Sequence, residues 1–599
     1  MEQKKARKAG IMDILRSPYA HRFFKKYKWS YLLGMAILIV IDSAQPEVPR
    51  IVGLVIDGIK YTTIEESGFA AAIGRMACIA VLVLAGRIGW RYCIFGAARK
   101  IERDMRNDLF SHLNTLPVSY FHEHNAGEIM AYMTNDIEAV RMTLAATIMM
   151  GLDMITIGVT TLLKMIFQID FWLSLVTVIP LSMVAFVSMF VGREMHKRFT
   201  KRHEVFAKVS DFVQEKLSGI KVIKAFVQEE KEIAAFEAVN SESRTANIRD
   251  AKVQAFMFPF MHMIAGCSMA IAIAYGGYIA ILGRITVGDF SAFVQYLNML
   301  VWPIASIGRI INVVTRGSAS LKRVESVLHT ESDIKDALPE IATTAPVKGE
   351  IEARELTFRY PGTDRDVLKD ISFHIEPGQT LGIVGRTGAG KTTLVNLMLR
   401  IIDPDDDMLY IGGREIHTIP LQTLRASTGY VMQDNFLFSD TIRNNIAFGD
   451  HTKSFEEIQQ AAKMACVHDN IVDFPDGYET MVGERGVSLS GGQKQRISIA
   501  RALILDPEIL ILDDALSAVD TDTEEKILEN LKTLRHGKTN IIIAHRISTL
   551  QNADKIIVVD GSRIIEEGNH EELVAQGGMY ADLYRRQLLE KMKKEEYKL

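Results

Sequence analysis

Residues 385–392 read Gly-Arg-Thr-Gly-Ala-Gly-Lys-Thr, and this stretch decides the fold of the second half of the chain. It fits the pattern GxxxxGK[ST] of a phosphate-binding loop. An apolar run from Leu381 to Val384 precedes it, and Thr393 to Arg400 is predicted to continue as a helix. In that setting, glycines let backbone N–H groups surround phosphates at a helix N-terminus. The stretch therefore predicts an α/β P-loop domain.

The chemistry expected of this loop depends on two of its side chains and on a second strand. Lys391 is expected to neutralise the β- and γ-phosphates, and the Thr392 hydroxyl is expected to ligate Mg²⁺. A buried strand predicted from Ile509 to Leu512 ends at Asp513, the expected partner of Mg²⁺ through water. Continuous Ile and Leu also occur in any core strand of a parallel sheet. The acid at the end of the strand, with a P-loop upstream, favours the metal site.

Composition divides the chain into parts of different character. At 599 residues it is too long for one core, and its 24% of charged residues are concentrated outside the apolar runs that crowd residues 30–315. A net charge of −4 argues against a nucleic-acid binder. The predicted parts are a basic cytoplasmic N-terminal segment at 1–28, a membrane domain at 29–329, a linker at 330–349 and a nucleotide-binding domain at 350–599.

Six apolar stretches are each long enough to span a bilayer, which takes roughly 20 residues. We place them near 29–56, 69–97, 140–167, 170–192, 254–282 and 286–314. Lys and Arg are abundant before the first span and in the two long loops, 99–141 and 193–252, but scarce in the other connections. Because positive segments stay on the cytoplasmic side, both termini are predicted to be cytoplasmic.

The two long loops are predicted to be helical extensions of the spans into the cytosol. Their turns, near Leu116–Phe121 and Gly219–Phe226, carry apolar side chains. The loops could be solvated connectors only. Because apolar groups are costly to leave in water, we expect the turns to dock onto the C-terminal domain.

Between the P-loop and the second strand lies Leu489-Ser490-Gly491-Gly492-Gln493, which opens a helical stretch from Lys494 to Leu505. A Ser-Gly-Gly turn at a helix N-terminus offers free N–H groups and the positive end of the helix dipole, which suit an anion. Taken alone, it could equally be a flexible N-cap.

In combination with Tyr360, Gln433 and His545, these motifs closely resemble the ATPase of ABC transporters, and six spans before one such domain resemble an exporter half-transporter. The resemblance implies a membrane all-α six-helix domain followed by an α/β P-loop NTPase domain of the ABC type, with ATP and Mg²⁺ as ligands. It implies that Tyr360 stacks on adenine, that Gln433 senses Mg²⁺ and the loops, and that His545 contacts the γ-phosphate. The implied ATP-binding residues are Tyr360, Gly385, Arg386, Thr387, Gly388, Ala389, Gly390, Lys391, Thr392 and Thr393; the metal residues are Thr392, Gln433 and Asp513; the catalytic residues are Asp514, His545 and Gln433.

The resemblance also assigns Leu489, Ser490, Gly491, Gly492 and Gln493 to the nucleotide held by a partner chain. The chain departs from the family at Asp514, where Glu usually polarises the attacking water. Misplacing a catalytic group by about 1 Å can cost on the order of 100-fold in rate. Asp514 could still reach the water through a small backbone shift. We favour a weakened site, resembling the degenerate-site subunit of heterodimeric bacterial multidrug exporters, whose signature motif serves a second half-transporter chain.

The resemblance implies an ATP-hydrolysing translocase in the cell membrane that moves drugs or lipid-like amphiphiles outward by alternating access, in contact with membrane lipid. The residues themselves do not choose a substrate, since Met and aromatic side chains in the spans suit ordinary helix packing or an adaptable apolar pocket. An importer or a lipid flippase of the same architecture is an alternative, and so is a nucleotide-sensing regulatory membrane subunit.

Overall fold

The computed structural model describes residues 17–336, 345, 347–483 and 489–596, which form two compact units. The first unit holds the described residues up to Thr115 together with His124–Glu331, and the second holds Leu116–Glu123 together with the chain from Ser332. Residues 1–16 of the predicted basic segment, and 337–344 and 346 of the predicted linker, lie outside the described residues.

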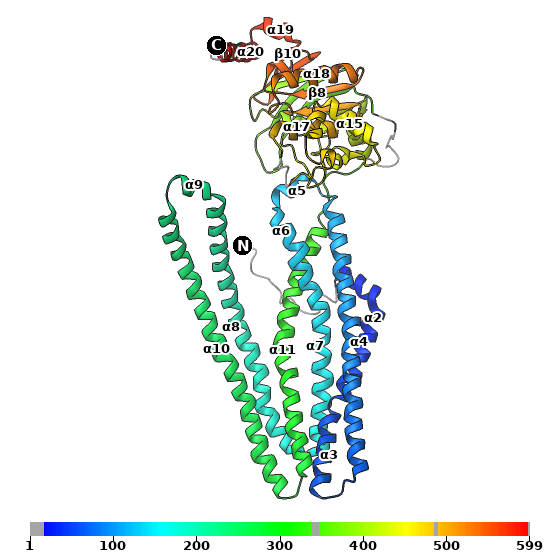
Figure 1. The fold of residues 1–599 in the computed structure, drawn as a ribbon, viewed down its shortest axis with the longest axis vertical. Helices are drawn as coiled ribbons and strands as arrows, with labels where there is room; N and C mark the ends of the chain where they lie inside the picture. The colour runs from blue at the N-terminus through cyan, green and yellow to red at the C-terminus, as the bar shows by residue number, and fades with distance from the viewer. Residues whose placement is uncertain (1–16, 337–344, 346, 484–488, 597–599) are drawn as a thin grey trace. The chain divides into compact units, whose positions relative to one another are not determined.

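The first unit is built of long helices (Figure 1). Helices α8 and α10 lie side by side as a hairpin with the short helix α9 at its tip, and α11 packs along α7. The bounds are α2 Pro18–Ala44, α3 Glu47–Lys60, α4 Glu66–Leu113, α6 Ala126–Ala131, α7 Ile137–Lys164, α8 Phe171–Ser218, α9 Ile220–Ala225, α10 Glu229–Ile281 and α11 Val287–Leu328, with π-helical turns η1 Tyr132–Asp136 and η2 Met165–Ile169. The start of the turn predicted near Gly219 is confirmed, since α8 ends at Ser218.

Five of the six predicted spans coincide with helical stretches that are long and apolar enough to cross a membrane. These stretches are Pro18–Lys60, Glu66–Leu113, Ala126–Ile169, His262–Ile281 and Val287–Leu328. The fourth predicted span, 170–192, falls on α8, where the described apolar part is the shorter Phe171–Met183. The count of six spans therefore stays a prediction.

The second unit contains two sheets. A six-stranded sheet has the order β10-β9-β3-β8-β7-β6, and a four-stranded antiparallel sheet has the order β2-β1-β4-β5. The strands are β1 Ile351–Phe358, β2 Leu368–Ile375, β3 Thr380–Gly385, β4 Leu409–Ile411, β5 Arg414–Glu415, β6 Thr428–Val431, β7 Ile509–Asp513, β8 Thr539–Ile543, β9 Lys555–Asp560 and β10 Arg563–Gly568. The predicted α/β P-loop domain is confirmed by the larger sheet and its helices. The antiparallel sheet was not predicted.

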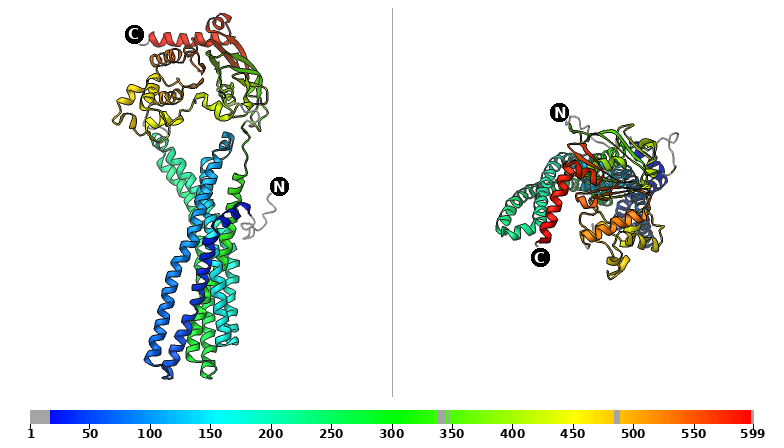
Figure 2. Two further views of the ribbon diagram at one scale, coloured as in Figure 1. Left: turned by 90° about the vertical axis from the view of Figure 1, so that its right-hand side faces the viewer. Right: turned by 90° about the horizontal axis from the view of Figure 1, so that it is seen from above.

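The larger sheet is parallel from β9 to β6, and only β10 runs antiparallel. Every residue of β7 and β8 is buried, as expected for central strands covered on both faces. The helices of this unit are α5 Val118–Glu123, α12 Lys391–Met398, α13 Leu421–Ala426, α14 Ile442–Ile446, α15 Phe455–Met464, α16 His468–Val472, α17 Gly491–Leu503, α18 Thr521–Leu534, α19 His570–Gln576 and α20 Met579–Glu596. Figure 2 shows α20, in red, as a straight helix at the periphery of the unit.

The two predicted docking turns differ in exposure. Leu116 and Tyr120, in and beside α5, are each 8% exposed, and their segment belongs to the second unit. At the tip of the α8–α10 hairpin, Val222 is 60% exposed and Phe226 is 71% exposed. The second turn thus carries apolar side chains that its own unit leaves exposed.

Candidate nucleotide site

Four neighbouring parallel strands deliver the predicted site residues to one edge of the sheet. The P-loop follows β3, His545 follows β8, Asp513 ends β7 and Gln433 follows β6. Ligands of open parallel sheets bind beyond the carboxyl ends of the strands. A cavity of about 280 Å³ lies there, lined by Val367, Thr387, Gly388, Ala389, Gly390, Lys391, Thr392, Thr393, Gln433, Asp513, Asp514, Ile543 and His545.

The glycines of the P-loop are needed for different physical reasons. Gly388 and Gly390 have φ of +80° and +97°, a region that favours glycine. Gly385 is instead required by the sheet, because a Cβ there would lie 2.1 Å from the carbonyl oxygen of Val559 on β9. Loop conformation and strand packing together fix the backbone around which phosphates would bind.

Lys391 begins α12 and is 8% exposed. Its Nζ donates to the carbonyl oxygens of Gly385 at 2.8 Å and Arg386 at 3.0 Å. Burial lowers the pKa of this ammonium group, and the nearby charges of Asp513 and Asp514 oppose that shift. A buried cation bonded only to carbonyls suits an anionic ligand that would supply the missing negative charge.

Asp513 and Thr392 meet at the carboxyl end of β7. Asp513 is 1% exposed and accepts a hydrogen bond from the Thr392 hydroxyl, while its Oδ2 has no partner. Burial raises the pKa of the Asp513 carboxyl; the Thr392 bond lowers it, and the charge of Asp514 raises it further. An orphaned buried carboxylate oxygen beside a threonine hydroxyl fits Mg²⁺, which prefers oxygen ligands.

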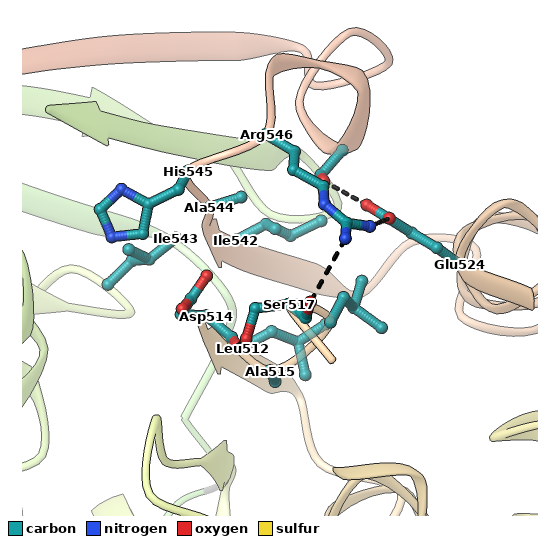
Figure 3. Close-up of a pocket in the computed structure, with 12 residues that line it drawn as sticks. Leu512, Asp514, Ala515, Ser517, Glu524, Ile542, Ile543, Ala544, His545 and Arg546 are labelled. Atoms are coloured by element: carbon teal, nitrogen blue, oxygen red, sulfur yellow. Dashed lines mark hydrogen bonds and ion pairs between the residues drawn. The ribbon is translucent and has the colours of Figure 1, made fainter. Parts of the chain in front are cut away.

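Asp514 starts the turn after β7 in a left-handed backbone conformation, with φ of +50°. Its N–H donates to the carbonyl of Ile543 at 2.9 Å, which ties the turn to β8. Among non-glycine residues, Asp and Asn tolerate this conformation best. The carboxylate of Asp514 and the ring of His545 lie on the same side of the strands (Figure 3).

A glutamine of the last helix holds the backbone around His545. The Gln587 side chain on α20 donates to the carbonyl of His545 at 2.7 Å and accepts from the N–H of Ile547 at 2.8 Å. The loop after β8 is thereby tied to α20.

Tyr360 lies beside the P-loop without lining the cavity. Its hydroxyl is hydrogen-bonded to the Thr393 hydroxyl at 3.1 Å, and its ring packs edge-on against Phe358. The side chain is 36% exposed, so its ring remains accessible to a flat ligand. Arg386, also predicted to bind ATP, is largely exposed and lies 3.8 Å from Asp560.

The signature residues form the N-terminus of α17, three residues before the predicted helix start. Ser490 is the N-cap: its Oγ accepts from the N–H of Gln493 at 3.3 Å, and the Gln493 side chain accepts from the N–H of Ser490 at 3.0 Å. The N-cap interpretation is confirmed. A capping box leaves the N–H groups of Gly491 and Gly492 available, so the anion site stays a prediction. Among the described residues, none of the five signature residues lines the cavity.

Sequence reasoning missed Gln495 and Glu524, which hold the turn after Asp514, and gave Arg546 no role. Gln495 is buried on α17, and the carboxylate of Glu524 is paired with Arg546. The position of Glu524 in the first turn of α18 suits an acidic residue in any helix, so the sequence held no signal of its pairing. Its burial, visible only in the structure, identifies it, because Glu is almost never buried unless paired.

Comparison with known proteins agrees with this geometry. Residues 31–304 match the family model of the ABC transporter transmembrane region, and residues 368–517 match that of the ABC transporter. YheI of Bacillus subtilis strain 168, a probable multidrug resistance ABC transporter ATP-binding/permease protein, is 38% identical over 95% of this chain and 97% of its own length. The chain belongs to the ABC transporter family.

This ABC transporter chain is also 37% identical to the multidrug resistance-like ATP-binding protein MdlA of Escherichia coli K12, over 95% of this chain and 96% of that protein. A bacterial Atm1-family ABC exporter, solved with ATP bound, aligns with 95% of this chain and 98% of its own, at a TM-score of 0.77 and 26% identity. The chain is therefore an exporter half-transporter, with a membrane domain fused to an ATPase domain.

Proposed function

We propose that this half-transporter works as one chain of a heterodimer whose two ATP sites differ in activity. Its own site binds Mg·ATP and hydrolyses it slowly, and its signature motif completes a faster site on the partner. The observation that carries the proposal is Asp514: a short carboxylate, in a left-handed turn, at the position next to Asp513 where the water-polarising group belongs.

In the chain's own site, each lining residue has a role that its position supports. Lys391 and the P-loop N–H groups hold the phosphates, His545 contacts the γ-phosphate, and Tyr360 stacks on adenine beside Thr393. Thr392, Asp513 and Gln433 hold Mg²⁺, which neutralises charge on the transferring phosphoryl group. Asp514 faces the same cavity, but it is one methylene shorter than Glu. That difference places its carboxylate short of the attacking water.

The signature motif supports the other half of the proposal. Ser490, Gly491 and Gly492 keep the intact Ser-Gly-Gly turn at the N-terminus of α17. Because they lie outside the chain's own cavity, their free N–H groups would serve phosphate held by a second chain. A weakened acid combined with an intact signature motif is the combination expected of one subunit of an unequal pair.

The cargo we propose is a drug or lipid-like amphiphile, exported across the cell membrane with both termini in the cytoplasm. The printed names of YheI and MdlA, which concern multidrug resistance, support this class. ATP would bind the closed arrangement of two ATPase domains more tightly than the open one, and that difference in affinity drives alternating access.

The test is to measure ATP turnover of the purified chain alone and together with the half-transporter that copurifies with it from its native membrane. Slow turnover alone and at least about tenfold faster turnover of the pair are expected, since one fast site is then completed. A Lys391→Ala change should lower the pair's turnover only modestly. Rapid turnover by the chain alone, with copies of itself, contradicts the proposal.

A further inference from the structure

The turn between β7 and α18, residues 514–519, is held from two sides by side chains that touch no phosphate site. Three of its carbonyl oxygens, those of Asp514, Ser517 and Val519, accept hydrogen bonds from side chains of other elements. In a strand such carbonyls would be paired by the sheet; here the pairing comes from α17 and from the loop after β8. The position of Asp514 thus depends on residues outside its own turn.

Gln495 of α17 holds one side of the turn. Its side-chain nitrogen donates to the Ser517 hydroxyl at 3.1 Å and approaches the Asp514 carbonyl at 3.4 Å, while its oxygen accepts from the N–H of Ala518 at 2.9 Å. The Ser517 hydroxyl donates in turn to the Asp514 carbonyl at 2.9 Å. Gln495 is 5% exposed, so water cannot readily replace these bonds.

The signature helix also approaches the turn by backbone contact. A Cβ on Gly492 would lie 2.9 Å from the carbonyl oxygen of Ala518. The helix N-terminus and the turn are therefore close enough that no side chain fits between them. Gln495 joins them on the next turn of the helix.

Arg546, from the loop after β8, contacts the same turn and Glu524 (Figure 3). Its guanidinium donates to the carbonyls of Ser517 and Val519, both at 3.3 Å, and to the Glu524 carboxylate at 2.8 Å. The second carboxylate oxygen of Glu524 accepts from the Thr549 hydroxyl. The Glu524 side chain is 3% exposed, and a buried carboxylate with both oxygens bonded fixes the direction of its arginine.

We propose that Arg546 and Gln495 are positioning residues for Asp514, with Glu524 orienting Arg546; this rests on the proposed function of Asp514. Arg546 directly follows His545, so one loop carries both the imidazole that faces the cavity and the guanidinium that holds the turn. Together the two contacts fix where the Asp514 carboxylate stands relative to His545. The slow turnover of this site then depends on Glu524, although Glu524 reaches neither nucleotide nor metal.

The test compares Glu524→Gln, Arg546→Lys and Gln495→Leu in the full-length chain, both with wild-type Asp514 and with Asp514→Glu. The matched control is Glu525→Gln, the exposed neighbour of Glu524 on α18. Turnover, KM for Mg·ATP and the hydrogen exchange of amides 514–519 are measured for each. The Ala518 N–H donates to the Gln495 side-chain oxygen, so its exchange rate reports this contact directly.

We expect turnover to fall by about tenfold or more in each of the three variants, with KM within about twofold of the parent, because only placement of the carboxylate changes. Turnover of the Arg546→Lys variant should fall too, because one ammonium group cannot replace a guanidinium that donates to two carbonyls and a carboxylate. Exchange of amides 514–519 should accelerate by about tenfold while the rest of the domain keeps its protection.

Three outcomes overturn the proposal. One is exchange and turnover matching the Glu525→Gln control. Another is acceleration of exchange throughout the ATPase domain, which would mean a general loss of stability. The third is an equal loss in turnover and ATP affinity. Hydrogen exchange reports the contacts of the turn independently of ATP turnover. A fast or inactive wild-type site would therefore contradict the proposed function, while the exchange rates would still test the positioning role.

Discussion

At the scale of single residues, the backbone conformation of Asp514 and its proposed role favour different side chains. Its φ of +50° favours Asp over Glu, while the longer reach expected of a water-polarising carboxylate favours Glu over Asp. A residue other than glycine adopts this left-handed conformation at a cost on the order of 1–3 kcal/mol, which Asp already bears and Glu would bear too. The turn therefore admits either carboxylate, and we propose that the choice of Asp bears on activity.

Replacing Asp514 with Glu should raise ATP turnover by the chain's own site by on the order of 10- to 100-fold, because the carboxylate gains one methylene of reach. The measurement is phosphate release at saturating Mg·ATP. Adding Lys391→Ala to the variant should abolish the gain, which would show that it arises at this P-loop. Unchanged turnover after Asp514→Glu would mean that Asp already reaches the water.

Asp513→Asn should stabilise the nucleotide-free protein at neutral pH. Burial raises the pKa of Asp513 above its ordinary 3.8, so the folded state favours the protonated form. The stabilising effect of that form is complete below 3.8 and is lost as pH rises through the raised pKa. Asn never ionises, so we expect its melting temperature to exceed that of the wild type by about 2 °C at pH 7.5, and the gap to close towards pH 4.

The wild type and the Asp513→Asn variant should also differ in their response to Mg·ATP. Mg·ATP should raise the melting temperature of the wild type, since binding to the folded state alone stabilises it, and should do little for Asp513→Asn. An Asn variant that melts lower than the wild type at pH 7.5 would show that the Asp513 carboxylate is not strained by burial.

At the scale of elements, sequence reasoning was most successful where a motif fixed both a strand end and a helix start. The P-loop, β7 and the signature helix were found within three residues, because glycine, lysine and a strand-ending acid constrain the backbone locally. The antiparallel sheet was missed, because β1 and β2 carry mixed burial and pair through contacts distant from any motif. The contacts of Gln495 and Glu524 were missed for a related reason: their partners lie on other elements.

The signature helix allows its folding role to be separated from its proposed service to a partner. Asp caps helices as well as Ser does, so Ser490→Asp should leave the melting temperature of the chain within about 2 °C. In the assembled transporter, however, the added carboxylate would face phosphate and should lower turnover at least tenfold or so. The readouts are melting temperature and ATPase rate of the pair.

Ser454→Asp is the matched control, because Ser454 caps α15 with the same capping box through Glu457. It should change neither quantity. If Ser490→Asp lowers turnover only in proportion to a loss of folded protein, the motif acts on this chain as a cap and the proposed role in the partner's site is wrong.

At the scale of the whole molecule, the tip at α9 exposes large apolar side chains, among them Val222 and Phe226. Replacing Phe226 with Ser removes apolar area without touching the ATP site, so ATP affinity should stay within about twofold. If the tip docks onto an ATPase domain, uptake of a fluorescent amphiphilic dye into inside-out vesicles should fall several-fold. Ile233→Ser, a similarly exposed position on α10, is the control and should transport normally.

Transport by Phe226→Ser equal to that of Ile233→Ser would remove the docking role of this tip. Sequence alone placed both turns and their apolar side chains, since helix breaks at glycine and proline are local signals. It could not tell which turn has buried apolar side chains, because burial is a property of the folded unit. Leu116 and Phe226 are both large apolar residues at predicted turns, and their exposed fractions differ about ninefold.

The contact of Gln587 with the loop of His545 has a consequence for how the protein is made. Domains fold as synthesis proceeds from the N-terminus, and the P-loop, β7 and His545 all leave the ribosome before α20. Until α20 has emerged, nothing from that helix secures the His545 carbonyl or the Ile547 N–H. A nascent or truncated chain ending before Met579 would therefore carry every ATP motif and still lack the two hydrogen bonds of Gln587 to this loop.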